Sequence, residues 1–300
     1  MILLNISYNQ LDGSIPSSIS QLSKMTILDL SHNNLNGVVP TSIGQLSNIK
    51  EIYLNHNNLS GVLPASMSNL IALNIVWLND NYFVGLVPDM RSAPLNALRI
   101  ENNSLDQIPD YSTVTTWGNQ LPFGFVIYGN KFTFDDLIPL SKIHRRYYYS
   151  FKPQDPIPLD SIIYINAGSN YIIITGVDPG LSDNNFKWFK DTNVVYISNR
   201  NTYEILNVTE ADEGYYSARI TNPLISDFEL EIAKFRVVVY NPNNCDKPIS
   251  SSSCSTAPEF CSTSELHSYC GTLTVPDTSC LLYTSPSPRD RTRSRMPSSA

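Results

Sequence analysis

The chain has 300 residues, of which 42% are apolar, and this length suggests about two domains with sizeable cores. Its formal net charge of −7 argues against a nucleic-acid partner or an anionic membrane surface. The sequence contains no run of about 18 apolar residues, so we expect no membrane insertion by this segment.

The first part of the chain is a tandem repeat. Three copies follow one another at a period of 24 residues, at 3–26, 27–50 and 51–74. A fixed period in this range indicates stacked repeats. Residues 46–59 follow the pattern L-x-x-I-x-x-I-x-L-x-x-N-x-L, which resembles the leucine-rich repeat, and GVLP at 61–64 resembles its plant-type form. The resemblance implies an α/β solenoid of mostly short parallel strands and irregular or 3-10 turns.

An asparagine recurs at one position and predicts about six repeats within residues 1–140. Because an amide can both donate and accept, we expect each of these to bond the backbone of its own turn and of the neighbouring coil. No capping segment precedes the first repeat, so we expect Met1 not to be the natural start and the chain to be a fragment. The predicted ladder residues are Asn9, Asn33, Asn57, Asn81, Asn103 and Asn130.

Alternate strand residues should point outward on the concave side of the solenoid and stack in columns from coil to coil. Aromatic and Arg side chains are enriched at binding hot spots, which predicts a ligand site around Tyr53, Trp77 and Arg99. The alternative is that strand propensity alone favours aromatic residues here. The first column is Asp29, Tyr53, Trp77, Arg99 and Val126, and the second is Ser31, Asn55, Asn79, Glu101 and Tyr128.

Nothing in the sequence points to catalysis. His32 and His56 occupy the same repeat position and should stack, but two ligands without a carboxylate column beside them do not make a zinc site. The sequence has neither a nucleophile elbow nor a phosphate-binding glycine loop. We therefore expect no enzyme activity, no cofactor and no metal.

The repeats should end near residue 140. The run at 125–137, followed by the linker at 141–154, resembles the closing repeat and linker of bacterial-type proteins that join leucine-rich repeats to immunoglobulin-like domains. From this resemblance we expect Phe132, Phe134 and Leu137 to cover the open end of the solenoid.

Residues 155–240 have short strand patterns every eight to twelve residues, which predicts an all-β sandwich. DEGYYSA at 212–218 resembles the tyrosine corner of immunoglobulin domains. An alanine stands where such domains have a disulfide cysteine, so we expect Trp188 to hold the sheets together by packing against Ile172, Ile174 and Ala218. The predicted core and corner residues are Trp188, Asp212, Gly214, Tyr216 and Ala218.

The end of the chain is a Ser/Cys-rich segment at 241–279 and a tail at 280–300. The cysteine spacing favours a small disulfide-bonded module, with zinc binding as the alternative. The tail resembles a translated sequencing adapter, and we expect it to be non-native; the alternative is a basic targeting tail. The candidate disulfide residues are Cys245, Cys254, Cys261 and Cys270. Candidate glycosylation sites of the type N-x-[ST] are Asn5, Asn58, Asn102 and Asn207.

Together these features predict an extracellular or cell-surface recognition or adhesion protein that binds a protein or glycan ligand on the concave face. One alternative is the ectodomain fragment of a leucine-rich-repeat receptor kinase. Another is the accessory binding region of a secreted enzyme.

Overall fold

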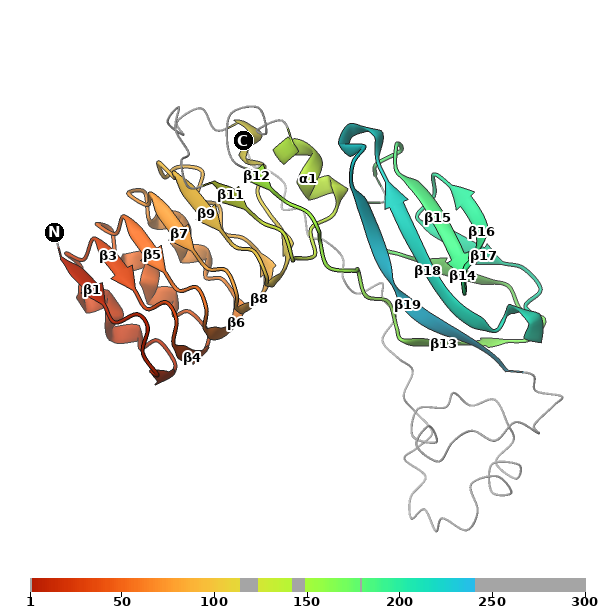
Figure 1. The fold of residues 1–300 in the computed structure, drawn as a ribbon, viewed down its shortest axis with the longest axis horizontal. Coiled ribbons are helices and arrows are strands. Elements are labelled where there is room, and N and C mark those ends of the chain that lie inside the picture. The colour runs from red at the N-terminus through yellow and green to blue at the C-terminus, as the bar shows by residue number, and fades with distance from the viewer. Residues whose placement is uncertain (1, 114–123, 142–148, 179, 241–300) are drawn as a thin grey trace, which may run out of the picture.

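The computed structural model describes residues 2–113, 124–141, 149–178 and 180–240. The predicted Ser/Cys-rich segment and the tail lie outside these ranges, as do Cys245, Cys254, Cys261 and Cys270. The described chain folds as a series of stacked coils followed by a region of longer strands (Figure 1).

The coils stack through two parallel sheets. The order of the seven-stranded sheet follows the chain, so each coil adds one strand beside the last. Its strands are β1 (Leu3–Asn5), β3 (Ile27–Asp29), β5 (Glu51–Tyr53), β7 (Ile75–Trp77), β9 (Ala97–Arg99), β11 (Phe125–Val126) and β12 (Tyr149–Ser150). The lateral sheet contains β2 (Asp12–Gly13), β4 (Asn34–Gly37), β6 (Asn58–Val62), β8 (Tyr82–Leu86) and β10 (Ser104–Gln107).

Each of the first three coils closes with a 3-10 turn that begins after a proline. Pro16, Pro40 and Pro64 precede η1 (Ser17–Gln21), η2 (Thr41–Gln45) and η3 (Ala65–Asn69). Proline fixes φ and lacks an N–H, so it suits a helix start, where the backbone donor would have no partner. A further turn, η4, spans Tyr111–Thr113. The GxxP element of the repeat therefore ends the lateral strand and starts the turn.

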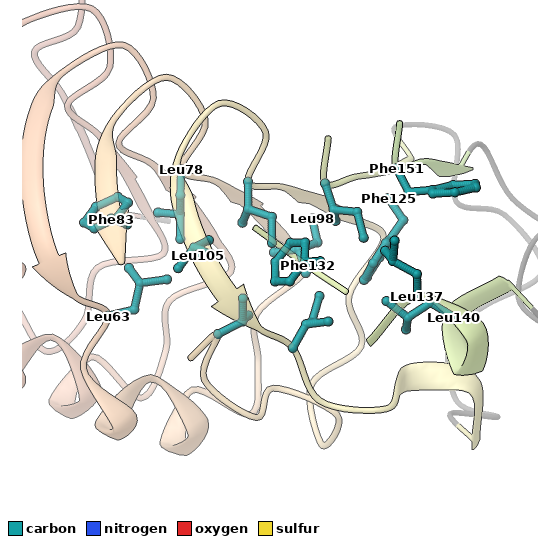
Figure 2. Packing of buried hydrophobic residues seen from close by; sticks show 14 of the residues in the cluster. Leu63, Leu78, Phe83, Leu98, Leu105, Phe125, Phe132, Leu137, Leu140 and Phe151 are labelled. Atoms are coloured by element: carbon teal, nitrogen blue, oxygen red, sulfur yellow. The ribbon is translucent and has the colours of Figure 1, made fainter. Parts of the chain in front are cut away.

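Apolar side chains fill the space between the sheets and the turns (Figure 2). Phe132, Phe134 and Leu137, the residues predicted to cover the end of the solenoid, have no exposed area. Helix α1 (Phe134–Ser141) carries two of them. The sheet continues into the predicted linker, where β12 pairs in parallel with β11. The seven-stranded sheet thus extends past the expected boundary at residue 140.

The following region contains a five-stranded and a two-stranded sheet. The five-stranded sheet has the order β13-β19-β18-β15-β16, and β14 pairs with β17 in the other. Two 3-10 turns, η5 (Glu210–Asp212) and η6 (Pro223–Ile225), flank β18. The strands are β13 (Ile162–Asn166), β14 (Tyr171–Ile174), β15 (Asn185–Lys190), β16 (Asn193–Ser198), β17 (Thr202–Ile205), β18 (Gly214–Thr221) and β19 (Glu229–Tyr240).

The prediction for the inward face of β14 is wrong. Ile172 and Ile174 are 52% and 59% exposed, whereas Ile173 is 2% exposed. Alternate strand residues point to opposite faces, and in an uninterrupted isoleucine run the sequence carries no signal for which face is buried. Trp188 instead stacks on Tyr203 of β17, with ring centroids 5.5 Å apart.

The two regions contact each other through α1. Asp178 accepts hydrogen bonds from the Phe134 backbone N–H (2.9 Å) and from the Thr133 hydroxyl, and it is 4% exposed. The Phe134 and Phe228 rings lie 5.8 Å apart, and Phe228 also contacts Phe151. A buried carboxylate at the helix start and an aromatic cluster therefore join the last coil to the second region.

Candidate functional site

The asparagines between the coils are structural. The Asn57 amide donates to Leu30 O of the preceding coil (3.0 Å) and to Leu54 O of its own coil (3.1 Å). Its Oδ1 accepts from Leu35 N at 3.0 Å. Asn9 differs, because it is exposed and donates only within its own turn. The same pattern of bonds to two coils recurs at Asn33, Asn81, Asn103 and Asn130.

The ladder keeps successive coils in register, and this aligns the first predicted column across the seven-stranded sheet. We call the outward side of that sheet the strand face. Asp29 pairs with Tyr53, Tyr53 with Trp77, and Trp77 with Arg99, one strand to the next. These four side chains are half-buried. Val126 aligns with Arg99 but is 5% exposed, so the last residue of the column is buried.

Tyr53, Trp77 and Arg99 contact one another as a cluster. The Tyr53 and Trp77 rings meet edge to face with centroids 5.0 Å apart. The Arg99 guanidinium lies 5.3 Å from the centroid of the Trp77 ring. Edge-to-face pairs and cation–π contacts are each favourable, so the three side chains hold one another in place. Such preorganisation reduces the entropy cost of binding.

Glu51 belongs to the same surface and was missed by the sequence reasoning. The Tyr53 hydroxyl donates to Glu51 Oε2 at 2.9 Å. Burial, followed by this hydrogen bond, raises the pKa of Tyr53 well above its usual range, so the hydroxyl stays a donor. Strand alternation could have identified Glu51, because it precedes Tyr53 by two residues in β5 and therefore lies on the same face.

The second predicted column is much less exposed than the first. Its exposed fractions are 6% for Ser31, 4% for Asn55, 4% for Asn79 and 1% for Glu101. The expectation that these residues form an open column is therefore corrected, since they lie low between outward-facing neighbours. Tyr128, at the end of the column, is half-buried.

Several buried polar atoms of this face have no partner within the described part of the chain. They are the acceptors Asn55 Oδ1, Asn79 Oδ1 and Glu101 Oε2, and the donor Trp77 Nε1. The other oxygen of Glu101, Oε1, accepts from Arg99 Nε at 2.9 Å. Burial nevertheless raises the pKa of Glu101, because the arginine only partly offsets the loss of water.

A rim of turn residues borders the strand face. His32 stacks between Tyr8 (4.1 Å) and His56 (4.2 Å), as the shared repeat position predicts. One carboxylate also belongs to this row, because Asp80 Oδ2 lies 3.4 Å from His56 Nε2. Burial and the neighbouring His56 lower the pKa of His32. The rim residues Tyr8, His32, His56, Asp80 and Asn102 all have left-handed φ values between 53° and 56°.

The predicted corner of the second region has a specific hydrogen bond. The Tyr216 hydroxyl donates to Asp212 O at 2.8 Å, and Tyr216 is 1% exposed. Trp188 is fully buried and pairs across the sheet with Ala218. Gly214 begins β18 with φ 151°, where an added Cβ would lie 3.0 Å from Lys190 Cε.

The candidate glycosylation sites all lie among the described residues, and Asn5, Asn58, Asn102 and Asn207 are all exposed. Asn5 lies on the strand face and donates to Asp29 Oδ2 at 3.0 Å. A glycan at Asn5 would therefore occupy the strand face itself.

Within the described ranges, no group of three or more His, Cys, Asp or Glu side chains could hold a metal ion. The same part of the chain has no helix that is long and apolar enough to cross a membrane.

Two leucine-rich-repeat families match the coils. One, described as Leucine rich repeat, matches residues 23–83, and the other, Leucine Rich Repeat, matches residues 2–22. The chain therefore contains leucine-rich repeats, which confirms that part of the resemblance. No curated protein matches the chain.

Part of the chain is similar to solved structures of plant proteins. The LRR ectodomain of the receptor kinase GASSHO1/SCHENGEN3 from Arabidopsis thaliana, in complex with CASPARIAN STRIP INTEGRITY FACTOR 2, is 22% identical, with a TM-score of 0.43 over 54% of this chain and 19% of that chain. The LRR ectodomain of the Arabidopsis thaliana receptor kinase SOBIR1 is 28% identical, with a TM-score of 0.39 over 43% of this chain and 69% of that chain. A plant ice-binding protein is 26% identical, with a TM-score of 0.41 over 53% of this chain and 51% of that chain. The matched part spans only 18%, 19% and 23% of three of the similar structures.

Proposed function

We propose that the chain is an extracellular or cell-surface recognition module that binds a protein ligand on its strand face. The observation that carries this proposal is the preorganised cluster of Tyr53, Trp77 and Arg99 on three neighbouring coils. Tyrosine, tryptophan and arginine are the residues that dominate binding energy at interfaces. A half-buried cluster of this kind offers a ligand apolar contact area and a charged edge in one place.

The second region has the role of a spacer in this proposal, as an immunoglobulin-like sandwich that presents the solenoid. Two features support the sandwich. Trp188 lies buried where Tyr203 of the two-stranded sheet stacks on it. The bond from the Tyr216 hydroxyl back to Asp212 O has the form of a tyrosine corner. The proposed domains are a solenoid from 1 to about 150 and a sandwich from 155 to 240.

A random-peptide display selection on the immobilised protein tests the strand-face assignment. We expect the selected peptides to lose about 30-fold or more in affinity for the Tyr53→Ala/Trp77→Ala variant, because loss of a hot-spot side chain costs about 2 kcal/mol or more. The thermal unfolding of this variant should change little, since both side chains are half-buried.

Tyr82→Ala is the matched control, because Tyr82 is a 63% exposed aromatic residue on the lateral sheet. It should leave the affinity of the peptides unchanged. If the selected peptides bind the Tyr53→Ala/Trp77→Ala variant as well as the unaltered protein, the strand face is not the binding surface.

A further inference from the structure

The strand face carries more negative than positive charge. Asp29, Glu51, Asp80 and Glu101 lie on it or on its rim. Arg99 is the cation on the strands of this face, with Lys50 exposed one residue before β5. Four carboxyl groups are therefore balanced by only two basic side chains that are charged at neutral pH.

The carboxylates differ in how they are neutralised. Glu101 has an arginine partner, since Arg99 donates to its Oε1. Asp29 accepts from the Asn5 amide (3.0 Å) and the Ser31 hydroxyl (2.7 Å), both of which are neutral donors. Glu51 accepts from the neutral Tyr53 hydroxyl. The hydrogen bonds at Asp29 and Glu51 orient the carboxylates without cancelling their charge.

The buried oxygen atoms that lack a donor also make the strand face more negative. Asn55 and Asn79 follow Tyr53 and Trp77 by two residues, and Glu101 follows Arg99, so alternation places their side chains on the strand face. Each has one oxygen without a donor and is at least 96% buried. An unpaired acceptor in a low-dielectric setting leaves its partial negative charge uncompensated. Three of these oxygens on neighbouring coils therefore add to the negative potential of the carboxylates.

One unpartnered atom has the opposite character. Trp77 Nε1 is a buried donor without an acceptor. A peptide carbonyl oxygen is a suitable partner for an indole N–H. A ligand that pairs with all of these groups thus needs cationic donors for the carboxylates and a carbonyl group near the indole N–H. A peptide with basic side chains supplies both.

We propose that the strand face recognises a basic peptide segment, whose cationic side chains bind near Asp29 and Glu51 while its backbone lies against Trp77. This inference rests on the proposed function and names the class of ligand. Arginine is well suited to the role because its planar fork of donors matches a carboxylate. The Arg99 side chain covers Glu101 and has to rotate before a ligand donor reaches that carboxylate.

The test uses three acetylated, amidated peptides of one length, (Gly-Arg)4, (Gly-citrulline)4 and (Gly-Glu)4, and follows binding by calorimetry. Citrulline keeps the shape of arginine and removes its charge. We expect the arginine peptide to bind at least tenfold more tightly than the citrulline peptide, and the glutamate peptide not to bind. Affinity for the arginine peptide should fall as sodium chloride is raised.

Matched variants separate a site from general attraction to an acidic protein. Asp29→Asn/Glu51→Gln should weaken the arginine peptide about tenfold or more. Asp12→Asn/Asp106→Asn removes the same charge from the exposed lateral sheet and should change its affinity less than twofold. Equal effects of the two pairs, or equal binding of the arginine and citrulline peptides, would overturn the inference.

The two proposals fail in different ways. If display-selected peptides lose binding in the Tyr53→Ala/Trp77→Ala variant but are neutral or acidic, the strand face is the binding surface and only the basic-ligand inference is wrong. If they bind that variant normally, the proposed function itself is wrong.

Discussion

The two regions of the molecule are stabilised by different kinds of interaction. In the solenoid, buried amides bond the backbones of adjacent coils, and the contacts join residues one repeat apart. In the second region, strands of up to 12 residues, mostly paired antiparallel, surround an aromatic cluster built on Trp188 and Tyr216. The first is a local, repeating structure and the second has a single shared core.

This difference explains where a binding surface can form. A solenoid carries its polar network and its leucines inside each coil, so the outward residues of its strands are not needed for folding. Tyr53 and Trp77 occupy such positions. In the second region Trp188 has no exposed area and Tyr216 is 1% exposed, so both belong to the core. The same residue type is thus half-buried on an outer face in one region and part of the core in the other.

The largest expected effect is the difference in stability between two Trp→Ala variants, one in each region. Trp188→Ala should destabilise the second region by about 3–5 kcal/mol, because it leaves a large cavity in its core. Trp77→Ala should cost the solenoid about 1 kcal/mol or less, since Trp77 is half-buried and packs beside Arg99 on an outer face. Differential scanning calorimetry of both variants measures the contrast.

In this experiment the solenoid transition should persist in Trp188→Ala while the transition of the second region moves to lower temperature. Equal shifts of all transitions in that variant would show that the two regions unfold as one unit. The solenoid would then depend for its stability on the core around Trp188.

A smaller effect is expected within the amide ladder. Asn57→Ala leaves the buried Leu35 N–H without an acceptor and removes donors from the carbonyls of two coils. An unsatisfied buried group costs about 1–3 kcal/mol, so we expect the solenoid to lose about 2 kcal/mol of unfolding free energy in denaturant titrations.

Asn9→Ala is the matched control at the same repeat position. The Asn9 amide donates only within its own turn and is exposed, so the loss should be below about 0.5 kcal/mol. Similar losses in Asn9→Ala and Asn57→Ala would mean that bonds between coils add nothing to the role of asparagine as a turn former.

The sequence predicted the repeating region well because its signals are local. The 24-residue period placed Asn57 and its equivalents in register, and strand alternation placed Tyr53 beside Trp77. Alternation could not show how deeply Asn55 and Glu101 lie, because exposure depends on the side chains of the neighbouring coils. The same period also places Asp80 one coil after His56, so the sequence did contain the signal for the His56–Asp80 contact.

Contacts between the two regions could not be predicted from the sequence for a related reason. Nothing near Asp178 in the sequence marks it as the acceptor for Phe134, which lies 44 residues away along the chain. In the second region, the uninterrupted run around Ile173 could not say which side faces the core. Where the sequence lacks periodicity, the face and partner of a residue are set by tertiary packing.

The smallest predicted effect concerns Asp178, which joins the two regions. Burial raises the pKa of Asp178 to about 6, although hydrogen bonds from Thr133 and Phe134 partly offset it. The folded protein therefore keeps a proton that the unfolded chain, with an Asp pKa of about 3.9, has already released. The contribution to stability is complete below about pH 4 and is lost as pH rises through about 6.

Asp178→Asn keeps an oxygen acceptor at the start of α1 and cannot ionise. We expect its free energy of unfolding to decline less between pH 4 and pH 7 than that of the unaltered protein, by about 1–2 kcal/mol across the range. Denaturant titrations at several pH values measure the difference. Asp183→Asn, at an exposed position in the same region, should leave the profile unchanged in shape. A profile for Asp178→Asn as steep as that of the unaltered protein would place the titration elsewhere, with Asp136 the next candidate because burial also raises its pKa to about 6.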